Sequence, residues 1–138
     1  MFAVDTNVLV YAADLDSPFH GPCRARILEW TQSASPWYLT WGIVYEFLRV
    51  MTHPRIFRTP FTLPNAWMFI ANLLASPSIG FLIPTERHSA AAAEVFAQSP
   101  LLSGNLLLDA HTAILMKEHG IRTIYTRDTD FHRFPFLE

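Results

Sequence analysis

The sequence predicts an α/β fold in which a central, mainly parallel sheet is covered by helices on both faces. Short apolar segments of strand length alternate with segments of ten or more residues that have helical spacing. Apolar strands of this kind are typical of parallel sheets that are buried by helices on both faces. The 138 residues contain no repeat and no low-complexity linker, so we expect a single domain over residues 1–138.

The expected elements follow one another with little connecting chain. Ser17 and Pro18 suit the N-cap and first position of a helix, and His53-Pro54 suits the end of another. Residues 127–138 read as a loop with room for a final short strand. Strands are predicted at residues 2–4, 36–40, 79–84 and 122–126, and helices at residues 7–14, 17–33, 41–52, 62–76, 85–99 and 105–120.

The composition favours a globular cytoplasmic protein. Hydrophobic residues make up 51% and charged residues 16% of the chain, enough for a sizeable core. No apolar run reaches the roughly 18 residues of a membrane span, and the start lacks the basic region of a secretion signal. Cys23 is the only cysteine, so no internal disulfide forms, as expected in a reducing compartment.

The charge balance restricts how this protein would contact a nucleic acid. The net charge is −2, whereas a general polyanion binder carries a basic excess. Nine of the ten basic residues are arginine, which binds phosphate with two parallel hydrogen bonds. Any contact with nucleic acid is therefore local, or depends on positive charge from another source.

Four acidic residues are predicted to meet at one edge of the sheet. Asp5 directly follows the first strand, and Glu46 lies one turn into the helix after the second strand. Asp128 follows the last strand, and Asp109 opens the helix that leads into that strand. Because the carboxyl ends of parallel strands share one edge, which is where α/β proteins form their sites, we expect these carboxylates to converge there.

Each acid also has an ordinary structural interpretation when it is taken alone. Asp5 and Asp109 suit helix N-caps, Asp128 suits a turn, and Glu46 could pair with Arg49 three residues on. Glu46 nevertheless lies on a very apolar helix, where an unpaired carboxylate is costly. Together the acids would repel one another and raise their pKa values, unless a divalent cation relieved the conflict.

Carboxylate oxygens are ligands that suit Mg²⁺ or Mn²⁺, and no His or Cys spacing here resembles a zinc site. Carboxylates with such an ion carry out phosphoryl-transfer chemistry, in which the metal activates water and stabilises developing charge. The ion would also supply the positive charge that the composition lacks.

Four segments together resemble a known family. VDTNVLVYA, YEFLRV, LLDAHTAILMKEHG and TRDTDF follow, in order and spacing, the motifs of PIN-domain ribonucleases. More narrowly they resemble the VapC toxins of bacterial toxin–antitoxin pairs, and EFLRVMTHPRIF is similar to a branch that is well represented in mycobacteria. The resemblance covers essentially the whole chain. It rests on the four segments taken in order, since the tripeptide DTN at residues 5–7 would be weak evidence by itself.

The resemblance implies a three-layer α/β/α fold and Mg²⁺- or Mn²⁺-dependent cleavage of RNA. It also implies a homodimer and a VapB-like antitoxin that lays a segment over the site. It leaves open whether Asp128 or Asp130 is the closer metal ligand. The residues carried over are the acidic metal-binding set Asp5, Glu46, Asp109 and Asp128, with Asp130 as a further contributor. The small polar residues Thr6 and Asn7 are expected to orient Asp5, and Thr126 matches a polar position beside the site.

Candidate contacts with RNA lie near the same edge. Arg49 and Arg127 are candidates for phosphate binding, whereas we expect Arg133 to pair with a nearby acid or to be solvated. Aromatic residues near the site could stack on bases, but their spacing favours core positions. These residues are Trp37, Tyr38 and Trp41. We also expect Trp67 and Phe69 in the core, and the alternative for these two is an exposed apolar patch that binds a second subunit or an antitoxin.

Other functions remain as alternatives. A phosphatase of the haloacid dehalogenase type needs a second Asp two residues after the nucleophile, where this chain has Asn7. A receiver domain needs an acidic pair and a late strand with Lys, which are absent. An inert PIN-like scaffold is the non-enzymatic alternative, and the presence of all four main acids counts against it.

Overall fold

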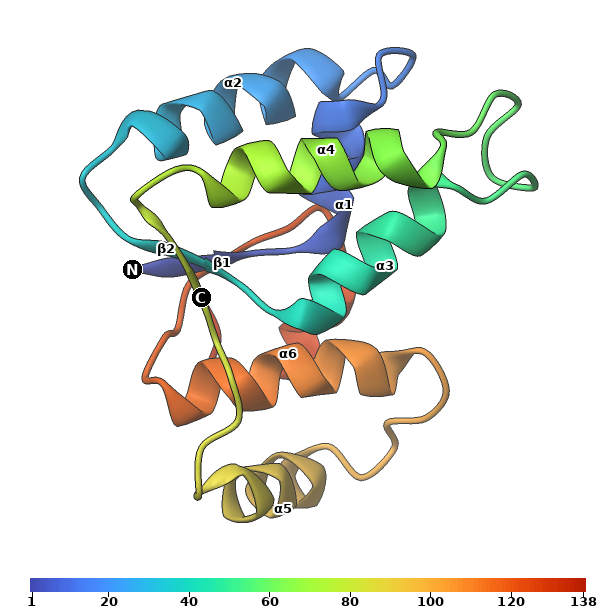
Figure 1. Ribbon diagram of the computed structural model, residues 1–138. Coiled ribbons are helices and arrows are strands. Elements are labelled where there is room, and N and C mark those ends of the chain that lie inside the picture. The colour runs from blue at the N-terminus through green and yellow to red at the C-terminus, as the bar shows by residue number, and fades with distance from the viewer.

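The central sheet has four parallel strands, as Figure 1 shows for the computed structural model, which describes residues 1–138. In spatial order they are β3 (Ile79–Phe81), β2 (Trp37–Leu39), β1 (Phe2–Val4) and β4 (Ile124–Tyr125). Ala3 is opposite Tyr38 on one side and Ile124 on the other, so β1 is central. The predicted parallel sheet is confirmed.

Helices cover both faces of this sheet, which confirms the three-layer α/β/α prediction (Figure 1). The last turn of the chain is a 3₁₀ helix, η1 (Thr129–Arg133), which packs against α6. One face carries α1 (Thr6–Ala13), α2 (His20–Gln32), α3 (Trp41–Met51) and α4 (Leu63–Leu74), and the other carries α5 (His88–Gln98) and α6 (Leu106–Glu118). None of the helices is long and apolar enough to cross a membrane.

The alternation of β1 divides the core between the two faces. Successive side chains of a strand point to opposite sides of the sheet. Val4 packs with α1, α2, α3 and α4, whereas Ala3 packs with Leu115 and Met116 of α6. Both β1 residues are fully buried, as expected for a strand with helices on each face. The residue after them, Asp5, is therefore held by a strand that cannot move without disturbing both halves of the core.

The residues that cap the helices match the prediction at some helix starts and differ from it at α2. The Thr40 and Thr62 hydroxyls accept hydrogen bonds from Ile43 N–H and Asn65 N–H, so both threonines are N-caps. The predicted start at Ser17-Pro18 is wrong, because α2 begins at His20. The Ser17 hydroxyl accepts instead from Phe19 N–H at 3.1 Å, which forms a local turn ahead of the helix.

Two boundaries near the acids also differ from the prediction. Asp109 does not open its helix, because α6 begins at Leu106 and places Asp109 in its first turn. Residues 127–138 were predicted to be a loop with room for a strand, but they contain η1 at Thr129–Arg133 and no strand. Glu138 still hydrogen-bonds along β4, since its N–H donates to Arg122 O and its carbonyl accepts from Ile124 N–H. Asp109 thus lies in the first turn of α6, whereas Asp128 is the N-cap of η1 and Asp130 lies within η1.

The strand order fixes where a site can form. The chain adds β2 and β3 to one side of β1 and then returns to add β4 on the other side. Ligands of open α/β sheets bind outside the carboxyl ends of the strands at such a reversal. Here the reversal lies between β1 and β4, where Asp5 and Asp128 follow the two strands.

A buried carboxylate fixes the opposite end of α6. Glu118 accepts hydrogen bonds from Thr85 N–H at 2.8 Å and the Thr85 hydroxyl at 2.7 Å, and it contacts His88 Nδ1 at 2.6 Å. Burial pushes the pKa of Glu118 upward, but these hydrogen bonds outweigh it and leave the pKa below its ordinary value. This group attaches the segment before α5 to α6, and thereby sets the position of α6.

Candidate metal centre

Asp5 joins β1 to α1 and is the most buried of the site carboxylates. Only 7% of the residue is exposed. It is the N-cap of α1, and one carboxylate oxygen accepts a hydrogen bond from Thr6 N–H at 2.7 Å. The other oxygen accepts a hydrogen bond from the Thr126 hydroxyl, also at 2.7 Å. Both oxygens are therefore oriented by the protein before any ion binds.

Thr126 links the residues that follow β4 to those that follow β1. Its hydroxyl donates to Asp5 and accepts from Asn7 Nδ2 at 3.2 Å and from Asp128 N–H at 2.9 Å. Asn7 Oδ1 in turn accepts from Arg127 N–H at 3.2 Å. The sequence predicted that Thr6 and Asn7 orient Asp5, and in the structure Asn7 is linked to Asp5 through the Thr126 hydroxyl.

Glu46 enters the site from α3, on the same face of the sheet as α1. The Thr6 hydroxyl donates a hydrogen bond of 2.9 Å to its carboxylate, so Thr6 contacts Asp5 through its backbone and Glu46 through its side chain. Arg49, the expected partner at i+3, lies 3.9 Å away and is 60% exposed. A pair this long and this exposed contributes little stability. Glu46 is thus held mainly by Thr6.

Three further carboxylates lie close together on the other side of the site. Carboxylate oxygens of Asp109, Asp128 and Asp130 all lie within 4.8 Å of one another. Asp128 is the N-cap of η1 and accepts a hydrogen bond from Asp130 N–H at 2.9 Å. Asp130 also pairs with Arg133 at 3.3 Å, which agrees with the structural role expected for that arginine. Asp128 has no such cationic partner.

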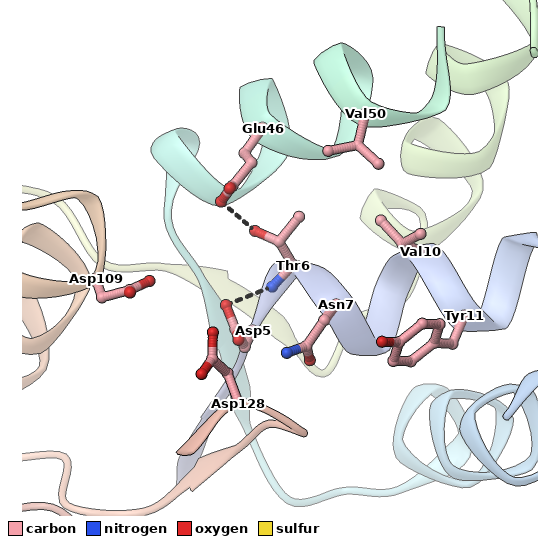
Figure 2. A pocket seen from close by; sticks show the side chains of 9 residues that line it. All are labelled: Asp5, Thr6, Asn7, Val10, Tyr11, Glu46, Val50, Asp109 and Asp128. Atoms are coloured by element: carbon pink, nitrogen blue, oxygen red, sulfur yellow. Dashed lines mark hydrogen bonds between the residues drawn. The ribbon is translucent and has the colours of Figure 1, made fainter. Parts of the chain in front are cut away.

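The four main acids line one cavity of about 250 Å³, where they point toward a common space (Figure 2). Asp5 and Thr6 lie at its centre, between Asp109 on one side and α3 on the other. Sequence reasoning missed three residues of this cavity, namely Val10, Tyr11 and Val50. Helical spacing would have found two of them, because Tyr11 follows Asn7 and Val50 follows Glu46 by four residues.

Burial and mutual repulsion shift the pKa values of two of these acids upward. Burial raises the pKa of Asp5 to about 6, with hydrogen bonds from Thr126 and Thr6 opposing the shift and Glu46 and Asp128 adding to it. Burial also raises the pKa of Asp109 to about 7, and the surrounding carboxylates raise it further. The charged site is therefore electrostatically unfavourable without a cation.

These shifts predict how the stability of the metal-free protein depends on pH. Asp5 and Asp109 bind protons more tightly in the folded state than in the unfolded chain, where their pKa is about 3.8. The folded state therefore carries more protons between about pH 4 and 7, and its free energy of unfolding falls as pH rises through that range. Thermal melts in EDTA should show this slope, and the Asp109→Asn variant should show a smaller one. Equal slopes would contradict the prediction.

The donor set fits a hard divalent cation. Carboxylate oxygens that lie within 4.8 Å of one another can share one ion, and Mg²⁺, Mn²⁺ and Ca²⁺ all prefer such ligands. His111 lies beside Asp109 and lines a small adjoining cavity, but its ring packs edge-on against His88 at 5.8 Å. Its pKa is lowered by burial and by His88. The site thus offers oxygen ligands and not a zinc-like nitrogen set.

The arginines and aromatic residues near the site differ in how they are held. Arg127 is exposed, and its guanidinium lies 3.5 Å from the centroid of the Phe19 ring. Trp37 is fully buried, as expected. Trp41 was expected in the core but is 43% exposed; one face of its ring stacks on Phe81 at the end of β3. Trp67 is 43% exposed on α4, whereas Phe69 stacks on Phe47.

Fold and site together define the class of protein. It is a parallel α/β/α domain whose carboxylates gather at the reversal of strand order, in an arrangement suited to a divalent metal. The chain matches the family described as PIN domain over residues 2–137. It therefore belongs to the PIN-domain family, and its relatives place it with the VapC proteins of that family.

Sequence relatives match over nearly their whole length. Ribonuclease VapC48 of Mycobacterium tuberculosis is 32% identical over 137 residues, which cover 94% of this chain and 89% of that protein. Ribonuclease VapC43 of the same organism is 34% identical, with 99% and 92% covered. These values confirm the resemblance to VapC proteins that the four segments indicated.

Solved structures agree with the fold. The crystal structure of Mycobacterium tuberculosis VapC20, described as a sarcin-ricin loop cleaving toxin, has a TM-score of 0.68 at 18% identity and covers 96% of this chain and 93% of that one. VapBC2 from Rickettsia felis, bound to a DNA fragment from its promoter, also has a TM-score of 0.68, at 15% identity, with 99% and 94% covered. At these identities the likeness concerns the fold alone.

Proposed function

We propose that this protein is an Mg²⁺- or Mn²⁺-dependent endoribonuclease of the VapC toxin type. The observation that carries the proposal is the cavity lined by Asp5, Glu46, Asp109 and Asp128 in a PIN-domain chain. Relatives that match over about nine-tenths of their length are named ribonucleases. The proposed reaction is hydrolysis: water adds to phosphorus and the bond to the 3′ oxygen breaks, leaving a 5′-phosphate and a 3′-hydroxyl.

The residues have separate roles in this proposal. Asp5, Glu46, Asp109 and Asp128 hold the ion or ions, and Asp130 contributes from the edge of the site. A bound divalent cation would lower the pKa of coordinated water and stabilise charge on the phosphate. Thr126 and Thr6 fix the carboxylates of Asp5 and Glu46 so that little reorganisation is needed on binding. The proposal assigns contacts with RNA phosphates to Arg49 and Arg127, and their exposure supports it.

The test is cleavage of total bacterial RNA by purified protein with Mn²⁺, with Mg²⁺ and with EDTA. We expect discrete cuts with either ion and none in EDTA. Asp5→Asn should cut nothing, because it loses a ligand charge at the centre of the cavity. Cleavage that persists unchanged in EDTA or in Asp5→Asn would overturn the metal-dependent mechanism.

Metal binding should also be visible without RNA. A ligand that binds only the folded state raises its stability by RT ln(1 + [L]/Kd), which is about 2.7 kcal/mol at a hundredfold excess over Kd. We therefore expect Mn²⁺ to raise the melting temperature of the wild-type protein and to have a much smaller effect on Asp109→Asn. If the protein is an inert scaffold, Mn²⁺ should not change the melting temperature of the wild type or of Asp109→Asn. The same thermal melts therefore distinguish a metal-dependent nuclease from a scaffold.

Two assembly properties belong to the same proposal. The exposed apolar side chains Trp41, Tyr45, Trp67 and Met68 of α3 and α4 support burial by a partner chain. We propose a homodimer and inhibition by a VapB-like antitoxin, in a cytoplasmic setting. Sedimentation of the free protein tests the first, and loss of RNA cleavage on addition of the antitoxin encoded beside it tests the second. A monomer at micromolar concentration would contradict the dimer.

A further inference from the structure

A basic loop begins close to the acidic cavity, at the end of α3. Val50, in the last turn of α3, lines the cavity, and α3 ends at Met51. Residues 52–61 then connect α3 to α4 and project outward beyond the end of α3 (Figure 1). At about 1.5 Å per helical residue, this loop begins only roughly 8 Å beyond Glu46 along the helix axis. The loop is therefore near enough to the cavity for a long ligand to contact both.

The charge of this part of the chain differs from that of the rest. No acidic residue occurs between Glu46 and Glu86, whereas Arg49, Arg55 and Arg58 all fall in that interval. Arg55 and Arg58 are exposed and have no carboxylate within salt-bridge distance. In a protein of net charge −2, Arg55 and Arg58 thus place two positive charges without a salt-bridge partner on one loop.

The loop is held in shape by its apolar residues. Phe57 and Phe61 pack against the main core, and Phe61 N–H donates to Met51 O at 2.8 Å, which closes the loop at its base. Within it, Ile56 N–H and Phe57 N–H both donate to His53 O, at 3.1 and 3.2 Å. The arginines are thus presented outward from an anchored turn, which reduces the entropy lost when they bind a ligand.

We propose that this basic loop is the docking surface for the single-stranded RNA backbone beside the cut, with Arg55 and Arg58 binding phosphates. The inference rests on the proposed function. RNA is favoured over an acidic protein segment because the loop continues from a cavity whose carboxylates suit a metal that acts on a phosphodiester. Those carboxylates repel the phosphates of a long RNA, so positive charge outside the cavity is needed to hold the strand.

The test compares two double variants with the same net charge. Arg55→Gln/Arg58→Gln removes the two loop charges, and Arg26→Gln/Arg122→Gln removes two exposed arginines that are already paired with Glu29 and Glu138. Binding of a fluorescein-labelled single-stranded RNA is measured by anisotropy in EDTA over a range of salt concentrations. The loop variant should bind roughly tenfold more weakly at low salt, and its slope of log K against log[salt] should be shallower by about 1.4, or 0.7 per lost phosphate contact. The control should match the wild type.

The other outcomes overturn the inference. Equal losses of RNA affinity in both variants would show a general charge effect. Unchanged RNA affinity in both variants would show that the loop does not hold RNA, and so would a wild type that binds no RNA at low salt. Weaker binding of a poly-glutamate peptide, with RNA binding unchanged, would assign the loop to an acidic protein segment. A parallel cleavage assay in Mn²⁺ separates the two proposals. If the wild type cleaves RNA and the loop variant binds RNA normally, only the role of the loop is refuted. If the wild type does not cleave RNA, the nuclease function is refuted, and the binding result is judged independently.

Discussion

Asp109→Asn is expected to reduce metal-dependent RNA cleavage by at least roughly a hundredfold, the upper end of what is lost when a residue merely orients a metal ligand. Asp109 lies in the first turn of α6 with its carboxylate close to those of Asp128 and Asp130. Asparagine keeps the shape of the side chain but removes the charge that would help to bind the ion. Cleavage rates at saturating Mn²⁺ give the measurement.

The same substitution should stabilise the protein when no metal is present. Burial and the neighbouring carboxylates raise the pKa of Asp109 to about 7, so its charged form is unfavourable in the folded state. Removing that charge relieves repulsion with Asp5, Asp128 and Glu46, and the melting temperature in EDTA at pH 8 should rise. Lower activity with higher stability is the trade-off expected at a site that evolved for function rather than stability.

A matched control is available on the surface. Asp16 is an exposed aspartate in the turn before α2, and its side chain makes no hydrogen bond. Asp16→Asn changes the net charge by the same amount and should leave both the cleavage rate and the melting temperature near those of the wild type. If Asp109→Asn lowers the melting temperature in EDTA, its carboxylate stabilises the fold and the electrostatic account of the site is wrong.

The general position of the site could be predicted from sequence because it depends on topology. An acid that closely follows a strand lies at the carboxyl edge of a parallel sheet. Asp5 directly follows β1, and Asp128 lies three residues after the end of β4. Glu46 was identified by its apolar surroundings on α3. In each case the signal lies in a few adjacent residues, and the prediction did not need the exact element boundaries.

Other features depend on contacts between distant segments and had no local signal. The Thr126 hydroxyl contacts Asp5 and Asn7 across about 120 residues of sequence. The stacking of Trp41 on Phe81 joins α3 to the end of β3, whereas the spacing of Trp41 resembles a core position. The 3₁₀ helix at Thr129–Arg133 has only 5 residues, whereas helical periodicity is recognised in windows of roughly 11–18 residues.

Thr126→Val is expected to weaken Mn²⁺ binding by roughly tenfold to a hundredfold, although no atom of Thr126 is proposed to touch the metal. Valine has nearly the same shape but no hydroxyl, so Asp5 loses the 2.7 Å hydrogen bond that favours its charged form. The pKa of Asp5 should therefore rise further above 6, and the ion must compete with a more tightly held proton. Calorimetric titration with Mn²⁺ at pH 6 and pH 8 should show the larger defect at pH 6.

The substitution also leaves two donors without an acceptor. Asn7 Nδ2 and Asp128 N–H both donate to this hydroxyl in the wild type. An unsatisfied, partly buried donor costs about 1–3 kcal/mol, so Thr126→Val should also be less stable than the wild type. Thr126→Ser restores the hydroxyl and should recover most of the metal affinity, while Thr129→Val, at an exposed neighbouring threonine, should have little effect. Equal Mn²⁺ affinity in Thr126→Val and the wild type would mean that burial alone positions Asp5, and that the hydrogen-bonded link between the two strand ends has no part in metal binding.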